Sequence, residues 1–341
     1  MLSGKGIFIW IVRETMDGNP QTIAEAVRKA GMTHAWIKIA DGSGRYNVTN
    51  GKDAARELIS ALRERGISPW GWQYVYGRYP DYEASMAISR IKELGVDGFV
   101  VNAEGEYKSA GAGNARRYMG LLRAAFPKLP IGLSSYRFPS YHREFPFDAF
   151  LSFCDFNAPQ VYWVGADNPD WQLEECVRQF RTLVSVQRPV FPTGAAYHER
   201  GWQPTAEQVV AFMRKARELG LDGFNFWEMG NCLRYLPGVW QEIEVFPWGA
   251  PVVDPEAPGT GDPGDALPIE ILQARVVSDV VTVRTGPGTR FPEKRRLTKG
   301  AVVNILDIRG SDAWIQIGQN PNLFIAAFYG NKRYVELLRN D

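Results

Sequence analysis

Four acidic residues directly follow short, mostly apolar runs of the chain, where their type and placement could support proton-transfer chemistry. Glu104 and Glu106 lie in Asn-Ala-Glu-Gly-Glu-Tyr, Asp41 follows Trp-Ile-Lys-Ile-Ala, and Glu228 follows Phe-Asn-Phe-Trp. Two carboxyl groups that flank a glycosidic bond can act as an acid and as a nucleophile or base. Glu104 is our first candidate for the acid, and Glu106, Asp41 and Glu228 are the candidates for its partner.

Aromatic and polar side chains accompany these acids. The chain contains 11 Trp, 14 Tyr and 18 Phe residues, and the apolar faces of sugar rings stack on Trp and Tyr. The predicted substrate contacts lie near the ends of the same runs and are Lys38, Tyr74, Tyr76, Asn102, Tyr136, Gln160, Tyr162, Trp163, Tyr197 and Trp227. Part of the aromatic excess is instead expected to be a packed layer, because Trp70, Trp72, Tyr74 and Tyr76 alternate along one run.

Other kinds of site lack their residue patterns. The three cysteines and three histidines show neither CxxC nor HExxH spacing, so we expect no disulfide framework, no bound metal and no cofactor. The 39 basic and 38 acidic residues leave a net charge of +1, so no global field recruits nucleic acid or an anionic membrane. The early apolar run 7–12 is too short for a signal segment or a membrane span, so any export would need a removed leader or another route.

The elements that must position the acids form a regular series. Short β-rich runs are predicted at 6–12, 35–40, 69–76, 98–103, 130–134, 157–163, 189–193 and 223–227. Amphipathic helices are predicted between most of them, at 22–30, 53–65, 82–94, 115–126, 171–184 and 205–219. Strands that alternate with helices pair in parallel through right-handed crossovers. We therefore predict an α/β fold, a (β/α)8 barrel over residues 1–246, whose active site lies at the C-terminal ends of the strands.

Alternation along the strands predicts which side chains face the barrel interior. Lys38 lies between Ile37 and Ile39 and should point inward, and Asn102 and Glu104 share one face of their run. Lys38 and Glu104 are then expected to form an ion pair inside the mouth of the barrel.

A second, smaller domain is predicted after a linker. Residues 247–268 contain six prolines and four glycines in 22 residues, a composition that disfavours packed structure. Residues 269–341 follow with several short β-type runs and turn residues between them, which indicates a small all-β barrel.

Three segments of the large domain resemble family 25 glycoside hydrolases, the lysozyme-type muramidases, and related barrels. Residues 99–104, Phe-Val-Val-Asn-Ala-Glu, stand where that family has Asp-x-Glu on strand four, and residues 35–42, Ala-Trp-Ile-Lys-Ile-Ala-Asp-Gly, are similar to its strand-two segment. Residues 158–163, Ala-Pro-Gln-Val-Tyr-Trp, are similar to a strand-six segment of related glycosidase-like barrels. Two family acids are absent, because Asn102 replaces the first carboxylate and no Asp follows Gly6. The resemblance therefore implies either another partner for Glu104 or a barrel without activity.

The small domain resembles bacterial SH3-like domains. Residues 282–288, Thr-Val-Arg-Thr-Gly-Pro-Gly, are similar to their N-V-R-S-G-P-S hairpin, and residues 297–303 and 313–317 are similar to the turn and the Trp strand that follow. The usual Gly-Trp-Val is replaced by Phe-Ile-Ala at 324–326. The resemblance implies a module that targets cell-wall peptides or glycans.

Two functions from different classes follow. The first is a glycosidase that acts on peptidoglycan or another polysaccharide as a monomer at the cell wall or outside the cell, and the resemblance implies a lysozyme-like activity. The alternative is a catalytically inactive barrel that binds glycan or protein partners, and Asn102 favours it. A phosphate-binding barrel enzyme is weaker, because no Gly-rich loop follows the seventh run.

Overall fold

The computed structural model describes residues 2–248, 273–285, 292–304, 307–309, 314–319, 322–326, 328–329 and 332–338. The chain divides into two compact units, Met1–Asp254 and Pro255–Asp341. The linker predicted at 247–268 lies outside the described residues from 249 onward, as do parts of the predicted SH3-like motifs, including residues 286–288 and 313.

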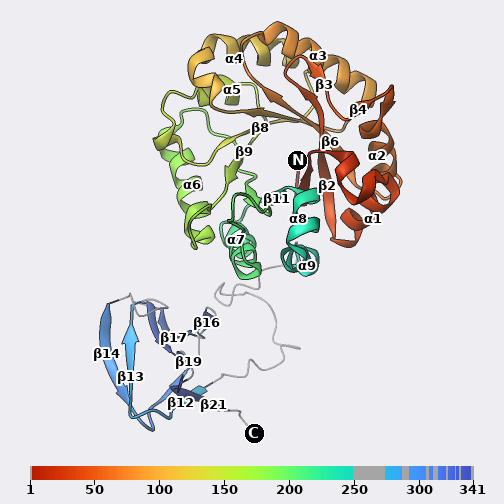
Figure 1. Ribbon diagram of the computed structural model, residues 1–341. Helices are drawn as coiled ribbons and strands as arrows, with labels where there is room; N and C mark the ends of the chain where they lie inside the picture. The colour runs from red at the N-terminus through yellow and green to blue at the C-terminus, as the bar shows by residue number, and fades with distance from the viewer. Residues whose placement is uncertain are drawn as a thin grey trace, which may run out of the picture. The chain divides into compact units, whose positions relative to one another are not determined.

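The first unit is a closed barrel of parallel strands (Figure 1). Its sheet has nine strands in the described residues, of which β3 (Gly44–Arg45) is an antiparallel addition to β2, leaving eight in the barrel. In chain order these are β1 (Gly4–Ile9), β2 (Met32–Asp41), β6 (Ser68–Val75), β7 (Phe99–Ala103), β8 (Ile131–Tyr136), β9 (Phe156–Val161), β10 (Thr193–Ala195) and β11 (Gly223–Trp227). The pairing of β1 with both β2 and β11 closes the ring. The predicted (β/α)8 fold is confirmed.

Helices surround the strands on the outside (Figure 1). They are α1 (Pro20–Lys29), α2 (Ala54–Arg63), α3 (Pro80–Leu94), α4 (Glu106–Ala125), α5 (Phe147–Leu151), α6 (Pro169–Leu183), α7 (Ala206–Glu218), α8 (Met229–Tyr235) and α9 (Pro237–Val245). Local chemistry sets several of their ends. The Thr205 hydroxyl and the Gln208 side chain form a reciprocal capping box at the start of α7. Gly95, at φ 61°, ends α3 in the left-handed conformation expected from its position in the sequence.

Two elements differ from the sequence-based prediction. The seventh strand was expected at 189–193 but covers only Thr193–Ala195, because Pro189 and Pro192 have no N–H to donate to a ladder. The fourth helix was expected from 115 but begins at Glu106 and is broken at Gly111 (φ 76°, ψ 178°). Because the glycines at 111 and 113 have low helix propensity, the sequence does not indicate the first turns of this helix.

The interior of the barrel is filled by aromatic side chains. Phe8, Trp36, Trp70, Trp72 and Phe156 belong to one buried cluster, with adjacent rings 4.9–6.2 Å apart, as in Phe8–Trp36 and Trp36–Trp70. Tyr74 and Tyr76 continue the same face of β6 toward the C-terminal ends of the strands, where Tyr76 is 41% exposed. The predicted packed layer therefore comprises the tryptophans, and the tyrosines lie at the mouth.

The second unit consists of short antiparallel strands. One sheet has the order β14 (Glu293–Thr298), β13 (Val280–Arg284), β18 (Asn322–Ala326), β17 (Trp314–Gln319), β16 (Asp307–Arg309). Another pairs β15 (Val302–Asn304), β12 (Gln273–Val276) and β21 (Val335–Leu338). Val276, Val281, Val283, Ile325 and Val335 form a small buried core.

Candidate active site

Glu104 lies directly after β7, at the C-terminal face of the barrel, where the strand ends and their following loops meet. Asn102 precedes it on the same face of the strand and is 6% exposed. Gln160, on β9, reaches both residues: its Nε2 donates to Glu104 Oε1 at 2.9 Å and to Asn102 Oδ1 at 3.0 Å. Ser134, on the intervening β8, accepts a weaker contact from the same amide at 3.4 Å. The Gln160 amide therefore holds the Glu104 carboxyl and is itself bonded to residues of β7 and β8.

The surroundings of Glu104 favour its protonated form. Burial raises the pKa of the Glu104 carboxyl, and the negative charge of Glu106 raises it further. Hydrogen bonds from Gln160 and Asn102 act in the opposite direction, but burial is the largest contribution. A carboxyl group whose pKa is raised by burial has the property required of a general acid.

Glu106 is the acid that accompanies Glu104. It is the first residue of α4, and its Oε2 accepts a hydrogen bond from the Tyr74 hydroxyl at 2.8 Å. Burial, followed by the charges of Glu104 and Glu106, raises the pKa of Tyr74. The phenol therefore stays neutral and acts as a hydrogen-bond donor to Glu106.

Lys38 points into the barrel as predicted, but its ionic partner is Asp41 and not Glu104. Lys38 Nζ bonds Asp41 Oδ2, and the Tyr76 hydroxyl donates to Asp41 Oδ1 at 2.8 Å. The ammonium also lies 4.2 Å from the Tyr46 ring centroid and 4.9 Å from that of Trp72. The expected Lys38–Glu104 pair is wrong because Asp41 ends the same strand as Lys38 and lies three residues away.

Glu228 forms the N-cap of α8. Its carboxylate accepts from the backbone N–H groups of Asn231 at 2.6 Å and Gly230 at 3.1 Å. The side chain is 7% exposed, and burial raises its pKa against these backbone hydrogen bonds. Both of its oxygens are thus engaged in starting a helix.

The predicted aromatic contacts divide between the mouth and the wall. Trp227 packs on Phe8 and Trp72 in the interior, at 5.2 and 5.5 Å between ring centroids. Trp163 is fully buried against α7, where its indole N–H donates to Gln208 Oε1 at 3.1 Å. Trp163 therefore does not reach the mouth, because β9 ends at Val161 and strand alternation no longer applies beyond it.

Tyr136, Tyr162 and Tyr197 gather on the same side of the face as Glu104. The charge of Glu104 is among the causes that raise the pKa of each of these tyrosines. Tyr162 and Tyr197 pack edge to face at 5.4 Å. These three phenols therefore stay neutral in the electrostatic field of the Glu104 carboxyl.

Two residues that the sequence reading missed complete this side of the face. The His142 imidazole stacks on the Tyr136 ring at 3.6 Å with 14° between the planes. Arg137 follows Tyr136 directly, and its guanidinium lies over the Phe138 ring at 5.0 Å. Their only sequence signal is that both lie within a few residues of the predicted end of the fifth strand.

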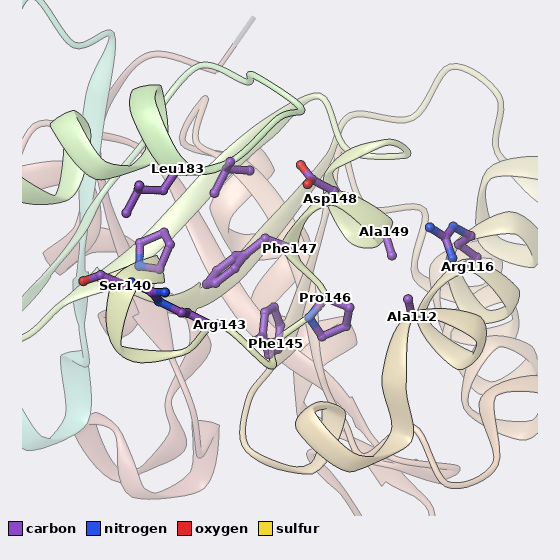
Figure 2. Close-up of a pocket in the computed structure, with 12 residues that line it drawn as sticks. Ala112, Arg116, Ser140, Arg143, Phe145, Pro146, Phe147, Asp148, Ala149 and Leu183 are labelled. Carbon is purple, nitrogen blue, oxygen red and sulfur yellow. The ribbon is translucent and has the colours of Figure 1, made fainter.

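Two hollows lie in this part of the molecule. A cavity of about 210 Å³ is lined by Tyr136, Arg137, His142, Gln160 and Tyr162, among others, and so adjoins the Glu104 carboxyl through Gln160. A larger one, of about 450 Å³, lies between α4, the 139–149 segment and the end of α6. Figure 2 shows Arg143 and Arg116 on opposite sides of this larger hollow, with Pro146 between them. None of the predicted site residues lines it.

In the part of the chain that the structure describes, no group of three or more His, Cys, Asp or Glu side chains is placed to hold a metal ion. Within the same residues, no helix combines the length and apolar character needed to cross a membrane.

No protein-family model matches the chain, and no curated protein matches its sequence. Solved structures do match its fold. A family GH18 chitinase from Cycas revoluta in complex with allosamidin superposes with a TM-score of 0.54 at 11% identity, over 71% of this chain and 99% of that chain. A class V chitinase from Nicotiana tobaccum gives 0.57 at 9% identity, over 73% and 99%.

The Bacillus cereus spore cortex-lytic enzyme SleL gives a TM-score of 0.52 at 11% identity, over 72% of this chain and 75% of that chain. At such identities the likeness shows the barrel fold. That fold is shared with several glycoside hydrolases, whereas neither family 25 nor an SH3-like domain is among the matches described.

Proposed function

We propose that the barrel is a glycoside hydrolase in which Glu104 donates a proton to the leaving oxygen of the glycosidic bond. The observation that carries the proposal is the Glu104 carboxyl itself: it lies at the C-terminal face, burial raises its pKa, and the neutral Gln160 amide holds it. A carboxyl group whose pKa is raised keeps its proton to higher pH, and one that is fixed in position can transfer that proton as the bond breaks.

Glu106 is the proposed second carboxylate, acting as nucleophile or as base toward water. It is the carboxylate whose charge raises the pKa of Glu104, and one of its oxygens accepts only from Tyr74 in the described structure. Asp41 and Glu228 are weaker candidates, because Lys38 and Tyr76 hold Asp41 and the start of α8 holds Glu228. Tyr74, Tyr136 and Tyr162 supply the surface on which sugar rings stack.

The proposed substrate is a cell-wall polysaccharide, and the proposed place of action is the cell wall or outside the cell. Two observations favour this class: the resemblance of residues 282–317 to bacterial SH3-like modules, and a fold shared with a spore cortex-lytic enzyme and with chitinases. The small domain would hold the barrel on the polymer.

Incubation with purified peptidoglycan, chitin oligomers and a panel of other polysaccharides, with reducing ends as the readout, tests the proposal. We expect release from at least one polymer, and a loss of about 10²–10⁴-fold in rate in Glu104→Gln. Glu174→Gln is the matched control, since Glu174 is 59% exposed on α6 and pairs only with Lys215 in the described structure. Activity that survives Glu104→Gln unchanged would remove Glu104 from its role.

A binding-only barrel is the second candidate, and Asn102 favours it because an amide stands where an acid pair would need a carboxylate. In that case the wild-type protein would bind a glycan of the panel without releasing reducing ends.

A further inference from the structure

The cavity beside Glu104 contains a cation without an acidic partner. Arg137 lines it, and the guanidinium Nε is buried with no hydrogen-bond partner. No carboxylate of the described residues forms an ion pair with Arg137, although most of the other buried or half-buried cations of the barrel have one, as Lys38 and Arg90 do. Burial lowers the pKa of Arg137, and the groups that oppose this are the Cys176 thiol and the Tyr197 and Tyr141 phenols.

The neighbours of Arg137 do not neutralise it. Lys108 lies 5.3 Å from the centroid of the Tyr136 ring, which also lines the cavity. His142 is a third basic group on this side, and its Nδ1 is buried without a partner. Burial, followed by the charges of Lys108 and Arg137, lowers the pKa of His142, so the imidazole is neutral near pH 7 and can donate or accept a hydrogen bond. Glu144 is the acid among the groups that shift the pKa of His142, and it raises that pKa.

Burying a cation without an acid is costly unless something else satisfies it. A guanidinium presents a planar fork of donors that matches a carboxylate in a bidentate arrangement. The cavity of about 210 Å³ is smaller than the roughly 300 Å³ at which pockets for whole small molecules begin. Its size therefore fits a substituent of a bound sugar and not a sugar ring.

We propose that this cavity is a subsite for a carboxylate carried by the glycan, with Arg137 as its main contact and His142 as a further hydrogen-bonding group. This inference deepens the proposed function and rests on it in so far as the ligand is a glycan. Gln160 links the two sites, since its amide bonds Glu104 and also lines the cavity. The acidic group therefore belongs to a sugar at or next to the bond that is cleaved.

Two kinds of sugar supply such a group, a lactyl ether of an amino sugar and a uronic acid. The probes are a tetrasaccharide of alternating N-acetylglucosamine and N-acetylmuramic acid and a hyaluronan tetrasaccharide, each paired with its methyl ester. Binding is measured by titration calorimetry on the full chain carrying Glu104→Gln, so that no probe is consumed. We expect at least one acid to bind about tenfold or more tightly than its ester, and the preferred pair identifies the source of the carboxylate.

Arg137→Met in the same background should remove most of that preference, and Arg137→Lys should retain part of it. Arg116→Met is the control, because Arg116 is exposed and lines the separate larger hollow. The comparison of acid with ester needs no change at residue 137, so it remains informative if Arg137→Met fails to fold. Equal binding of acids and esters, or a preference that survives Arg137→Met, overturns the inference.

Hydrolysis assays with the wild-type chain separate the two proposals. If an acid binds in a manner that depends on Arg137 but no glycan is cleaved, the subsite is supported and the hydrolase proposal is wrong. If glycans are cleaved equally well with and without a free carboxylate, the hydrolase proposal is supported and the subsite proposal is wrong.

Discussion

The C-terminal face of the barrel has acids on two sides, and the two sides hold them differently. On the side of β2 and β11, Asp41 is ion-paired with Lys38 and Glu228 caps α8. On the side of β7–β9, Glu104 is held by a neutral amide and lies within the influence of a second acid, Glu106. An acid at the end of a strand is thus a catalytic candidate only when its oxygens are not already committed to the fold.

The largest expected effect on stability is on the β2 side. Lys38 is 6% exposed and Asp41 is 29% exposed, so Lys38→Met would leave a half-buried carboxylate without its counter-ion. Because Asp41 keeps some contact with solvent, we expect a loss of about 2–3 kcal/mol in the free energy of unfolding, below the roughly 3–5 kcal/mol of a fully buried pair. Urea unfolding measures it.

Lys52→Met is the matched control for this prediction. Lys52 also forms an ion pair, with Glu57 at 3.3 Å, but the two side chains are 70% and 43% exposed. Exposed pairs contribute little, so the urea midpoint should stay close to that of the wild type. If the free energy of unfolding falls equally in the two variants, the Lys38–Asp41 pair stabilises the fold no more than an exposed pair does.

A smaller effect is expected at Glu228. Glu228→Ala removes the acceptor for two backbone N–H groups at the start of α8 and should lower the free energy of unfolding by about 1 kcal/mol. Glu228→Gln keeps one acceptor oxygen and carries no charge to be buried, so it should lose less. A reducing-end assay on both variants tests this interpretation. If Glu228→Gln folds stably but loses its activity, Glu228 has a catalytic role and is not only a helix cap.

The smallest effect is a shift in pH dependence at Glu104. A general acid works while protonated, so kcat/KM should fall as pH rises through the raised pKa of Glu104. Glu106→Gln removes the charge that raises this pKa, so the alkaline limb of the residual activity should move to lower pH, while the rate itself falls because Glu106 is the proposed second carboxylate.

Asp41→Asn provides the comparison for this shift. Asp41 is not among the groups that act on the Glu104 pKa, so the alkaline limb should stay in place whatever happens to the overall rate. A limb that moves with Asp41→Asn and not with Glu106→Gln would exchange the two acids in the proposed mechanism.

Most of the barrel could be predicted from the sequence because its signals are local. Apolar runs of strand length alternate with amphipathic helices, and glycines such as Gly95 end helices where expected. The seventh strand and the start of α4 were misplaced because prolines and glycines made the local signal ambiguous, and tertiary pairing decided the outcome.

The site was predictable only as far as strand alternation extends. Alternation predicted that Lys38 points inward, where its ammonium lies over the Trp72 ring, and that Asn102 and Glu104 share one side, where the Gln160 amide bonds both. It could not choose between Asp41 and Glu104 as the partner of Lys38, since that depends on distances across the barrel. Trp163 and Arg137 lie beyond the last residues of β9 and β8, where the alternation of side chains between the two faces no longer applies.

The aromatic cluster inside the barrel limits the path by which a polymer can reach the strand ends. Trp36, Trp70 and Trp72, together with Phe8 and Phe156, fill the interior beneath the C-terminal face. No chain can thread through a barrel that is packed in this way. Under the proposed function, a glycan would lie across the strand ends to reach Glu104, and both fragments would leave by the face on which the polymer arrived.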